Sequence, residues 1–121
     1  MMQKLAKREA QIMQAVWQLE KAFIKDIIEL LPDPKPHYNS VSTMVKLLEE
    51  KGFVSHEKLG NAYRYFAIVP KEDYQEKMVD EVVKGYFDDS PIKLVNYFAK
   101  EQKLDAKDLE RLIKMIKNKD Q

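Results

Sequence analysis

Apolar residues recur every three or four positions in the first part of the chain, a spacing that predicts helices. The first helix covers residues 7–19, and a shorter one covers residues 24–31. The second helix ends before Pro32, because proline lacks the backbone N–H that a helical turn requires. Asn39 is a suitable N-cap for a third helix, which runs to about residue 50.

The spacing becomes strand-like after Gly52, a residue that commonly ends a helix. Aromatic and β-branched residues are frequent in residues 53–57 and 62–68, and residues 58–61 between them suit a hairpin turn. Three helices followed by a β-hairpin is the order of a winged helix, a variant of the helix-turn-helix. The sequence therefore predicts a mainly α fold with a small β-hairpin, in which residues 1–70 form a winged helix-turn-helix domain.

Three further amphipathic helices are predicted after Pro70, and the second and third begin at the caps Ser90 and Asp105. Some fifty residues are too few to bury three apolar faces alone, so we expect residues 71–121 to form a C-terminal three-helix dimerisation arm. The alternative is that these helices fold back onto the first domain of the same chain. The apolar positions expected at the interface of a homodimer are Tyr74, Met78, Val82, Leu94, Val95, Phe98, Leu109, Leu112, Ile113 and Ile116.

Composition limits the classes of function. The chain has 121 residues, no cysteine and two histidines, which excludes disulfides and thiolate catalysis. No glycine-rich phosphate loop or metal motif is present, so we expect neither an enzyme nor a cofactor or metal site. No segment reaches the ~20 apolar residues of a membrane span. We therefore expect a cytoplasmic protein without membrane insertion.

The formal net charge of +1 hides an uneven distribution, because residues 34–48 and 58–71 contain no acidic side chain. The first of these segments includes most of the predicted third helix. Its face opposite the apolar stripe carries short polar side chains and one lysine, which are Ser40, Ser42, Thr43 and Lys46. Such a face fits the major groove of DNA, where Ser, Thr and Lys bond bases or phosphates. From the residues alone, simple capping and decoration of the helix explain it equally well.

Four segments resemble the BlaI/MecI penicillinase-repressor family. YNSVSTMVKLLEEKGFV (residues 38–54) resembles its recognition helix, and AYRYFAIVPKEDY from Ala62 resembles its wing strand. KREAQIMQAVWQLEKA from Lys7 resembles its opening segment, and DLERLIKMIK resembles its last dimerisation helix. The resemblance implies a homodimeric repressor that binds a palindromic operator in double-stranded DNA. It places DNA contacts at Tyr38, Asn39, Ser40, Ser42, Thr43 and Lys46 around the recognition helix, and at Lys58, Asn61 and Arg64 on the wing.

The wing departs from the family pattern, because Asn61 stands where relatives often carry a basic residue. Lys58 and Arg64 would then anchor the wing, unless Arg64 braces the hairpin through Tyr63 or Tyr65. The alternative to DNA binding is that the winged helix serves as a protein-interaction module.

The fifth helix also departs from the family. Members that control β-lactam resistance are inactivated by proteolysis at an Asn–Phe bond, and the aligned residues here are Tyr97–Phe98, preceded by Asn96. A shift of one residue rotates a helical position by ~100°. Cleavage by a membrane sensor metalloprotease, and with it a link to antibiotic resistance, therefore stays open. The copper-responsive branch of the family uses C-terminal cysteines, which this chain lacks.

Overall fold

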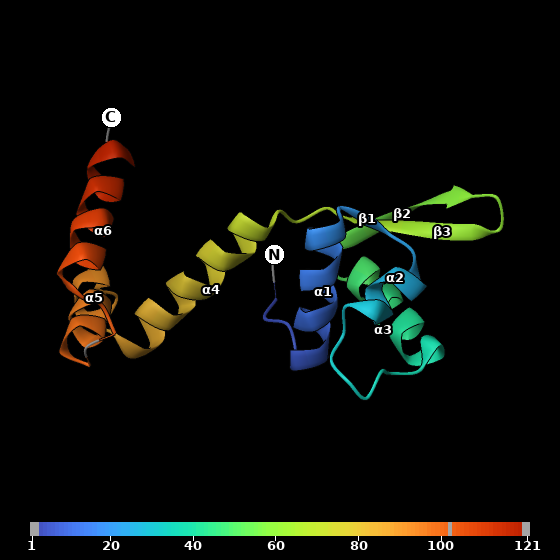
Figure 1. The fold of residues 1–121 in the computed structure, drawn as a ribbon, viewed down its shortest axis with the longest axis horizontal. Coiled ribbons are helices and arrows are strands. Elements are labelled where there is room, and N and C mark those ends of the chain that lie inside the picture. Colours follow the sequence, from blue (N-terminus) through green and yellow to red (C-terminus); the bar gives the residue numbers. More distant parts are fainter. Residues whose placement is uncertain (1–2, 102, 120–121) are drawn as a thin grey trace. The chain divides into compact units, whose positions relative to one another are not determined.

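The computed structural model describes residues 3–101 and 103–119, with side chains as far as residue 115. The chain divides into two compact units, Met1–Met78 and Val79–Gln121. Figure 1 labels the helices and strands of both units. The division falls inside the fourth helix, beyond the boundary at residue 70 that the sequence suggested.

The first unit contains three short helices and a small antiparallel sheet. Its elements are α1 (Lys7–Leu19), β1 (Lys21–Ala22), α2 (Ile24–Glu29), α3 (Tyr38–Glu50), β2 (Val54–Leu59) and β3 (Ala62–Ala67). Except for β1, their order is the predicted one. α1 has the predicted bounds, whereas α2 ends at Glu29, before the expected residue 31.

β3 is the central strand of the sheet, with β1 on one side and β2 on the other. β2 and β3 form a hairpin, the wing, in which Leu59 pairs with Ala62. The turn is therefore only Gly60 and Asn61, shorter than the four residues expected, and Gly60 supplies the positive φ of 62° that it requires. β1 has only two residues, so it is too short to show the alternation of apolar and polar residues by which a strand is recognised in a sequence.

The core of the first unit lies between its helices and the sheet. Its largest side chains with almost no exposure are Ile12, Met13, Val16, Ile27, Leu31, Val41, Val45, Leu48, Phe53 and Val54. Removing one such side chain from water contributes about 1.5–3 kcal/mol. The apolar stripes of α1 and α3 meet here, so their polar faces must point outward.

The predicted cap of α3 is wrong. The helix begins at Tyr38, so that His37 is the N-cap residue and Asn39 lies inside the first turn. His37 has an extended backbone and accepts the N–H of Val41 through its carbonyl, but its side chain makes no capping bond. The start of α3 after the proline-rich loop thus relies on backbone hydrogen bonding and not on a side-chain cap.

Tyr74 belongs to the packing of the first unit. The N–H of Leu5 donates to its hydroxyl oxygen (2.9 Å), and its ring lies 5.9 Å from Trp17 and 5.8 Å from Phe53 between centroids. Trp17 in turn donates from Nε1 to the carbonyl of Val69 (2.9 Å). These contacts fix the first turn of the fourth helix on the winged-helix core, a role distinct from the dimer contact expected of Tyr74.

The remaining helices are α4 (Lys71–Tyr86), α5 (Pro91–Lys100) and α6 (Ala106–Lys119). The predicted caps are confirmed for α5 and α6. Ser90 Oγ accepts the N–H of Lys93 (3.3 Å), and Asp105 and Asp108 exchange side-chain bonds to each other's N–H groups. Within the described residues, no helix is both long and apolar enough to cross a membrane.

Glu9 joins two parts of the first unit and makes its stability depend on pH. Its carboxylate accepts from Lys51 Nζ (2.7 Å) and from the N–H of Ala6 (2.9 Å), and the bond from Lys51 holds the pKa of Glu9 below its usual range. This contribution is complete above the ordinary glutamate pKa and disappears as the pH falls through the lowered one.

We expect Glu9→Gln to lower the free energy of unfolding by about 0.5–1 kcal/mol at pH 7. The difference from the wild-type chain should vanish in acid, because the wild-type carboxyl is then protonated as well. Denaturant titrations across a pH series measure this. A difference that stays constant from neutral pH into acid would contradict the role of the ion pair.

Candidate nucleic-acid interface

The two faces of α3 differ sharply in chemistry. Val41, Val45 and Leu48 are fully buried at helical spacing. The side chains that the resemblance assigned to the groove lie on the outside: Asn39, Ser40, Thr43 and Lys46 are exposed, and Ser42 is half-buried. Apart from Leu47, which is 44% exposed, the outward face of α3 is thus polar, and it is free of acidic residues until the last turn of the helix.

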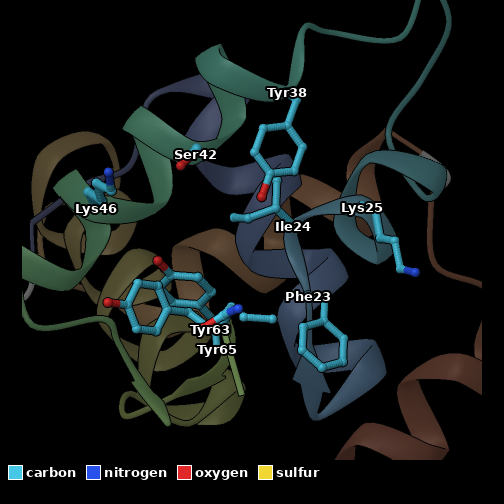
Figure 2. A pocket seen from close by; sticks show the side chains of 10 residues that line it. Phe23, Ile24, Lys25, Tyr38, Ser42, Lys46, Tyr63 and Tyr65 are labelled. Carbon is cyan, nitrogen blue, oxygen red and sulfur yellow. The ribbon is translucent and has the colours of Figure 1, made fainter. Parts of the chain in front are cut away.

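A hollow of about 480 Å³ lies between α3, the wing and the start of α2 (Figure 2). It is lined by Phe23, Ile24, Lys25, Tyr38, Ser42, Lys46, Asn61, Ala62, Tyr63 and Tyr65. None of these residues is acidic. The hollow brings together four of the predicted contacts: Tyr38, Ser42 and Lys46 from α3, and Asn61 from the turn of the wing.

The other predicted contacts do not line this hollow. Asn39, Ser40 and Thr43 are elsewhere on the exposed surface of α3, and Lys58 is exposed near the tip of the wing. No pattern in the sequence indicated a binding role for Phe23, Ile24, Lys25, Tyr63 or Tyr65. The start of α2 lies close to the wing because β1, which leads into α2, pairs with β3, and the sequence pattern did not reveal β1.

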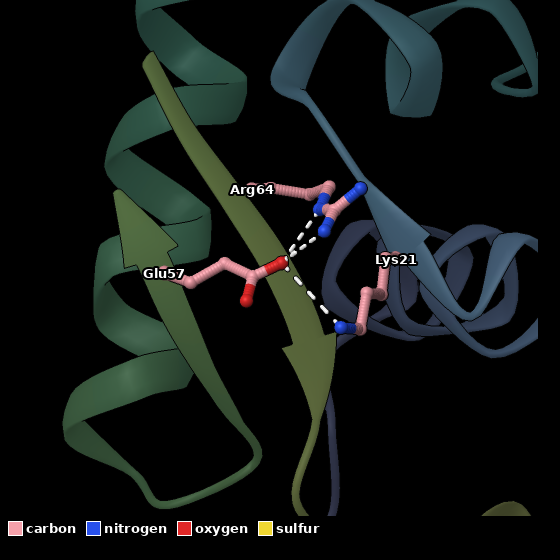
Figure 3. A network of polar contacts seen from close by, with 3 residues as sticks. All are labelled: Lys21, Glu57 and Arg64. Atoms are coloured by element: carbon pink, nitrogen blue, oxygen red, sulfur yellow. Dashed lines mark hydrogen bonds and ion pairs between the residues drawn. The ribbon is translucent and has the colours of Figure 1, made fainter. Parts of the chain in front are cut away.

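Arg64 braces the wing through an acidic partner (Figure 3). It lies opposite Glu57 in the register of β2 and β3, and its guanidinium donates to Glu57 Oε1 from Nε (2.7 Å) and from the second terminal nitrogen. Lys21 of β1 donates to the same oxygen (3.5 Å). Hydrogen bonding from Arg64 holds the pKa of Glu57 below its usual range. The partner is therefore Glu57, and neither Tyr63 nor Tyr65 as the sequence analysis suggested.

A second contact joins the wing to α3. His56 Nδ1 lies 2.6 Å from Glu49 Oε1, and the imidazole packs against the rings of Tyr63 (4.6 Å) and Tyr65 (5.6 Å between centroids). His56, Tyr63 and Tyr65 share one face of the hairpin, because His56 pairs with Tyr65 in the register. Only the strand register reveals this cluster.

The residues expected at a dimer interface fall into several groups. Val82 and Ile113 are exposed. The half-buried ones are Met78, Leu94, Val95, Phe98, Leu109 and Leu112. The side chain of Ile116 lies outside the described residues. In the segment compared with the family cleavage site, Asn96 and Tyr97 are exposed on α5, and Phe98 is half-buried with its ring against Tyr97.

Three helices and a wing that lies beside the third helix define the first unit as a winged helix. A solved structure supports this assignment, the solution structure of the DNA-binding domain of the repressor BlaI. The two structures align with a TM-score of 0.51 and 25% sequence identity, and the alignment covers 60% of this chain and 94% of the BlaI domain.

Sequence comparison leads to the family. Residues 5–118 match the family model of the penicillinase repressor. The methicillin resistance regulatory proteins MecI of Staphylococcus aureus (strain N315) and Staphylococcus epidermidis are each 24% identical to the chain, over 96% of its length and 95% of theirs. The chain belongs to the penicillinase repressor family, as the resemblance predicted.

The brace of the wing makes a prediction about coupling. Arg64→Gln and Glu57→Gln should each lower the melting temperature, and the double variant should lower it no further than Glu57→Gln alone, because both changes remove the same pair. Thermal unfolding followed by circular dichroism measures this. Lys58→Gln removes a neighbouring exposed charge of the hairpin and should leave the melting temperature unchanged. Additive losses from Arg64→Gln and Glu57→Gln would show that the pair is not coupled.

Proposed function

We propose that the chain is a DNA-binding transcriptional repressor that acts as a homodimer on a palindromic operator. The observation that carries this proposal is the outward face of α3, where short hydroxyl and amide side chains and Lys46 lie beside the wing without an acidic residue until the last turn. DNA carries a high density of negative charge, so a face without carboxylates enters its groove with less electrostatic repulsion. Membership of the penicillinase repressor family and the likeness to the BlaI DNA-binding domain support the same function.

Thr43 and Lys46 are the proposed readers of the major groove. The Thr43 hydroxyl donates to the carbonyl of Asn39 (2.9 Å), so its oxygen is left to accept a bond. The amino groups of adenine and cytosine are donors in the major groove, whereas Lys46 suits the acceptors of guanine. Asn39, Ser40 and Ser42 share this face of α3, where their short polar side chains bond bases or backbone.

Residues at the start of α3 and on the wing are proposed to contact the phosphates of the DNA backbone. Tyr38 begins α3 and Asn61 forms the turn of the wing, and both line the hollow. Lys58 is exposed on the same hairpin and supplies a charge for the backbone. Arg64 is assigned to holding the wing in place, because its guanidinium is already bound to Glu57.

The alternative function, a module that binds another protein, has less support. It requires an apolar surface on the outward side of α3, where protein partners bury their contacts. Leu47 is 44% exposed, but it stands among polar and charged neighbours, and Met44 packs against the core.

Homodimerisation is proposed for the second unit from its own apolar surface. Ile113 (51% exposed), Val82 and Tyr97 are large apolar side chains that the described part of the unit leaves partly open to solvent. Three helices of this size gain stability when such a surface is covered by a second copy.

Relief of repression by proteolysis is a finer part of the proposal. Asn96 and Tyr97 are exposed on α5, so a protease reaches this helix from solvent once it unwinds. A cut between Tyr97 and Phe98 would separate α6 from the remainder of the chain and weaken dimerisation. A membrane sensor metalloprotease is the partner that the family resemblance suggests.

The experiment that tests DNA binding measures the affinity of the chain for its own upstream DNA across a salt series. Thr43→Glu should weaken specific binding by at least about tenfold, because a carboxylate in the groove is repelled by phosphates and loses its base contact. Gln14→Glu, which adds the same charge on an exposed position of α1, is the matched control. Binding of Thr43→Glu at wild-type strength, with its fold intact, would contradict the assignment of α3.

The dimer is tested by sedimentation of the full chain. Ile113→Asp should shift the protein from dimer towards monomer, because it buries a charge in the apolar interface. Lys114→Asp changes the neighbouring exposed residue of α6 and should leave the dimer intact. A monomeric wild-type chain, or a dimer that is equally stable in both variants, would contradict this interface.

A further inference from the structure

The hollow between α3 and the wing has the construction of a small-molecule site. Its volume of about 480 Å³ falls within the range of ~300–1,000 Å³ that is common for ligand pockets. Phe23, Ile24 and Ala62 and three tyrosine rings supply much of its lining. Phosphate contacts use basic and hydrogen-bonding groups and gain nothing from such apolar walls. The lining therefore favours a ligand with an apolar body of its own.

Tyr65 provides a polar group that lines this hollow. The residue is only 3% exposed, but among the described residues its hydroxyl makes no hydrogen bond and is not one of the buried polar atoms that lack a partner, so the hydroxyl is open to the hollow. Burial raises the pKa of Tyr65, and the nearby charge of Glu49 adds to the effect, so the hydroxyl keeps its proton at neutral pH. Glu49 itself is bound to His56 and does not line the hollow. The Tyr65 hydroxyl can thus donate a hydrogen bond to an oxygen of a ligand.

Lys46 and two tyrosine hydroxyls lie together on one side of the hollow. In Figure 2, Lys46 and the hydroxyls of Tyr63 and Tyr65 lie on one side, whereas Phe23, Ile24 and Lys25 lie on the other, and the ammonium of Lys25 points away from the other labelled side chains. No acidic residue lines either end. This arrangement matches a molecule with an anionic group at one end and a flat apolar body at the other.

We propose that the hollow binds a small aromatic carboxylate, whose oxygens accept bonds from Lys46 and the Tyr65 hydroxyl while its ring lies against Phe23 and Ile24. Tyr38, Ser42 and Lys46 line the hollow and also belong to the proposed DNA interface. Ligand and operator therefore exclude each other, and the ligand releases the repressor from DNA. This consequence rests on the proposed function, but ligand binding itself does not.

The test uses the full chain and 2-naphthoate as the probe, with 2-naphthalenemethanol as its neutral counterpart. Calorimetric titration should show saturable binding of the anion with a Kd near or below about 1 mM, and much weaker binding of the alcohol. Tyr65→Phe keeps the buried ring and removes the hydroxyl, and should weaken the anion about tenfold, as expected for a lost bond to a charged group. Tyr86→Phe makes the same change at a residue that is 83% exposed, and should have no effect.

Three results would overturn the inference: no saturable binding up to about 10 mM, equal binding of the neutral alcohol, or equal affinity of Tyr65→Phe and wild type. Should Tyr65→Phe not fold, Lys46→Gln on the exposed surface of α3 must show the same weakening instead. Competition against labelled upstream DNA separates the two proposals. Loss of DNA binding on adding naphthoate supports both the ligand site and the proposed function. A chain that binds DNA but no ligand overturns only the ligand site. A chain that binds the ligand but no DNA overturns only the proposed function.

Discussion

The burial of one side of α3 is the constraint on which the rest of the first unit depends. Val41, Val45 and Leu48 have no exposed surface, and α3 packs against both α1 and α2. At about 1.5–3 kcal/mol for each large side chain, the stripe cannot rotate out of the core. Its burial fixes the rotation of the helix and so presents Thr43 and Lys46 to solvent. The outward face of mostly small polar residues, which has little packing energy of its own, is held in place by the apolar face behind it.

The wing needs a different means of support, because a two-stranded hairpin is only marginally stable by itself. One carboxylate and two cations across the sheet tie β2 and β3 to β1: Glu57 accepts hydrogen bonds from both Arg64 and Lys21. On the other face of the hairpin, His56 connects β2 to Glu49 at the end of α3. The wing is therefore bound both to the sheet and to the proposed recognition helix, and the hollow between them has fixed walls.

Local patterns in the sequence predicted those features of the fold that depend on contacts between residues close together in the chain. The periodicity of α1 and the caps Ser90 and Asp105 rely on contacts within a few residues, and the structure confirms them. β1 and the packing of Tyr74 on Trp17 depend on residues far apart in the chain, and no local pattern reveals them. The candidate site divides in the same way. The outward face of α3 follows from helical spacing, whereas the Glu57 partner of Arg64 and the part of the hollow at the start of α2 follow from strand pairing.

The same ion pairs explain how a chain of net charge +1 can present a face suited to a polyanion. Glu49 at the end of α3 and Glu57 on β2 are each bound to a basic group, His56 and Arg64 respectively. Lys46 stands on the lining of the hollow, where no carboxylate competes for it. The local arrangement of charges, and not their sum, thus determines what the surface attracts.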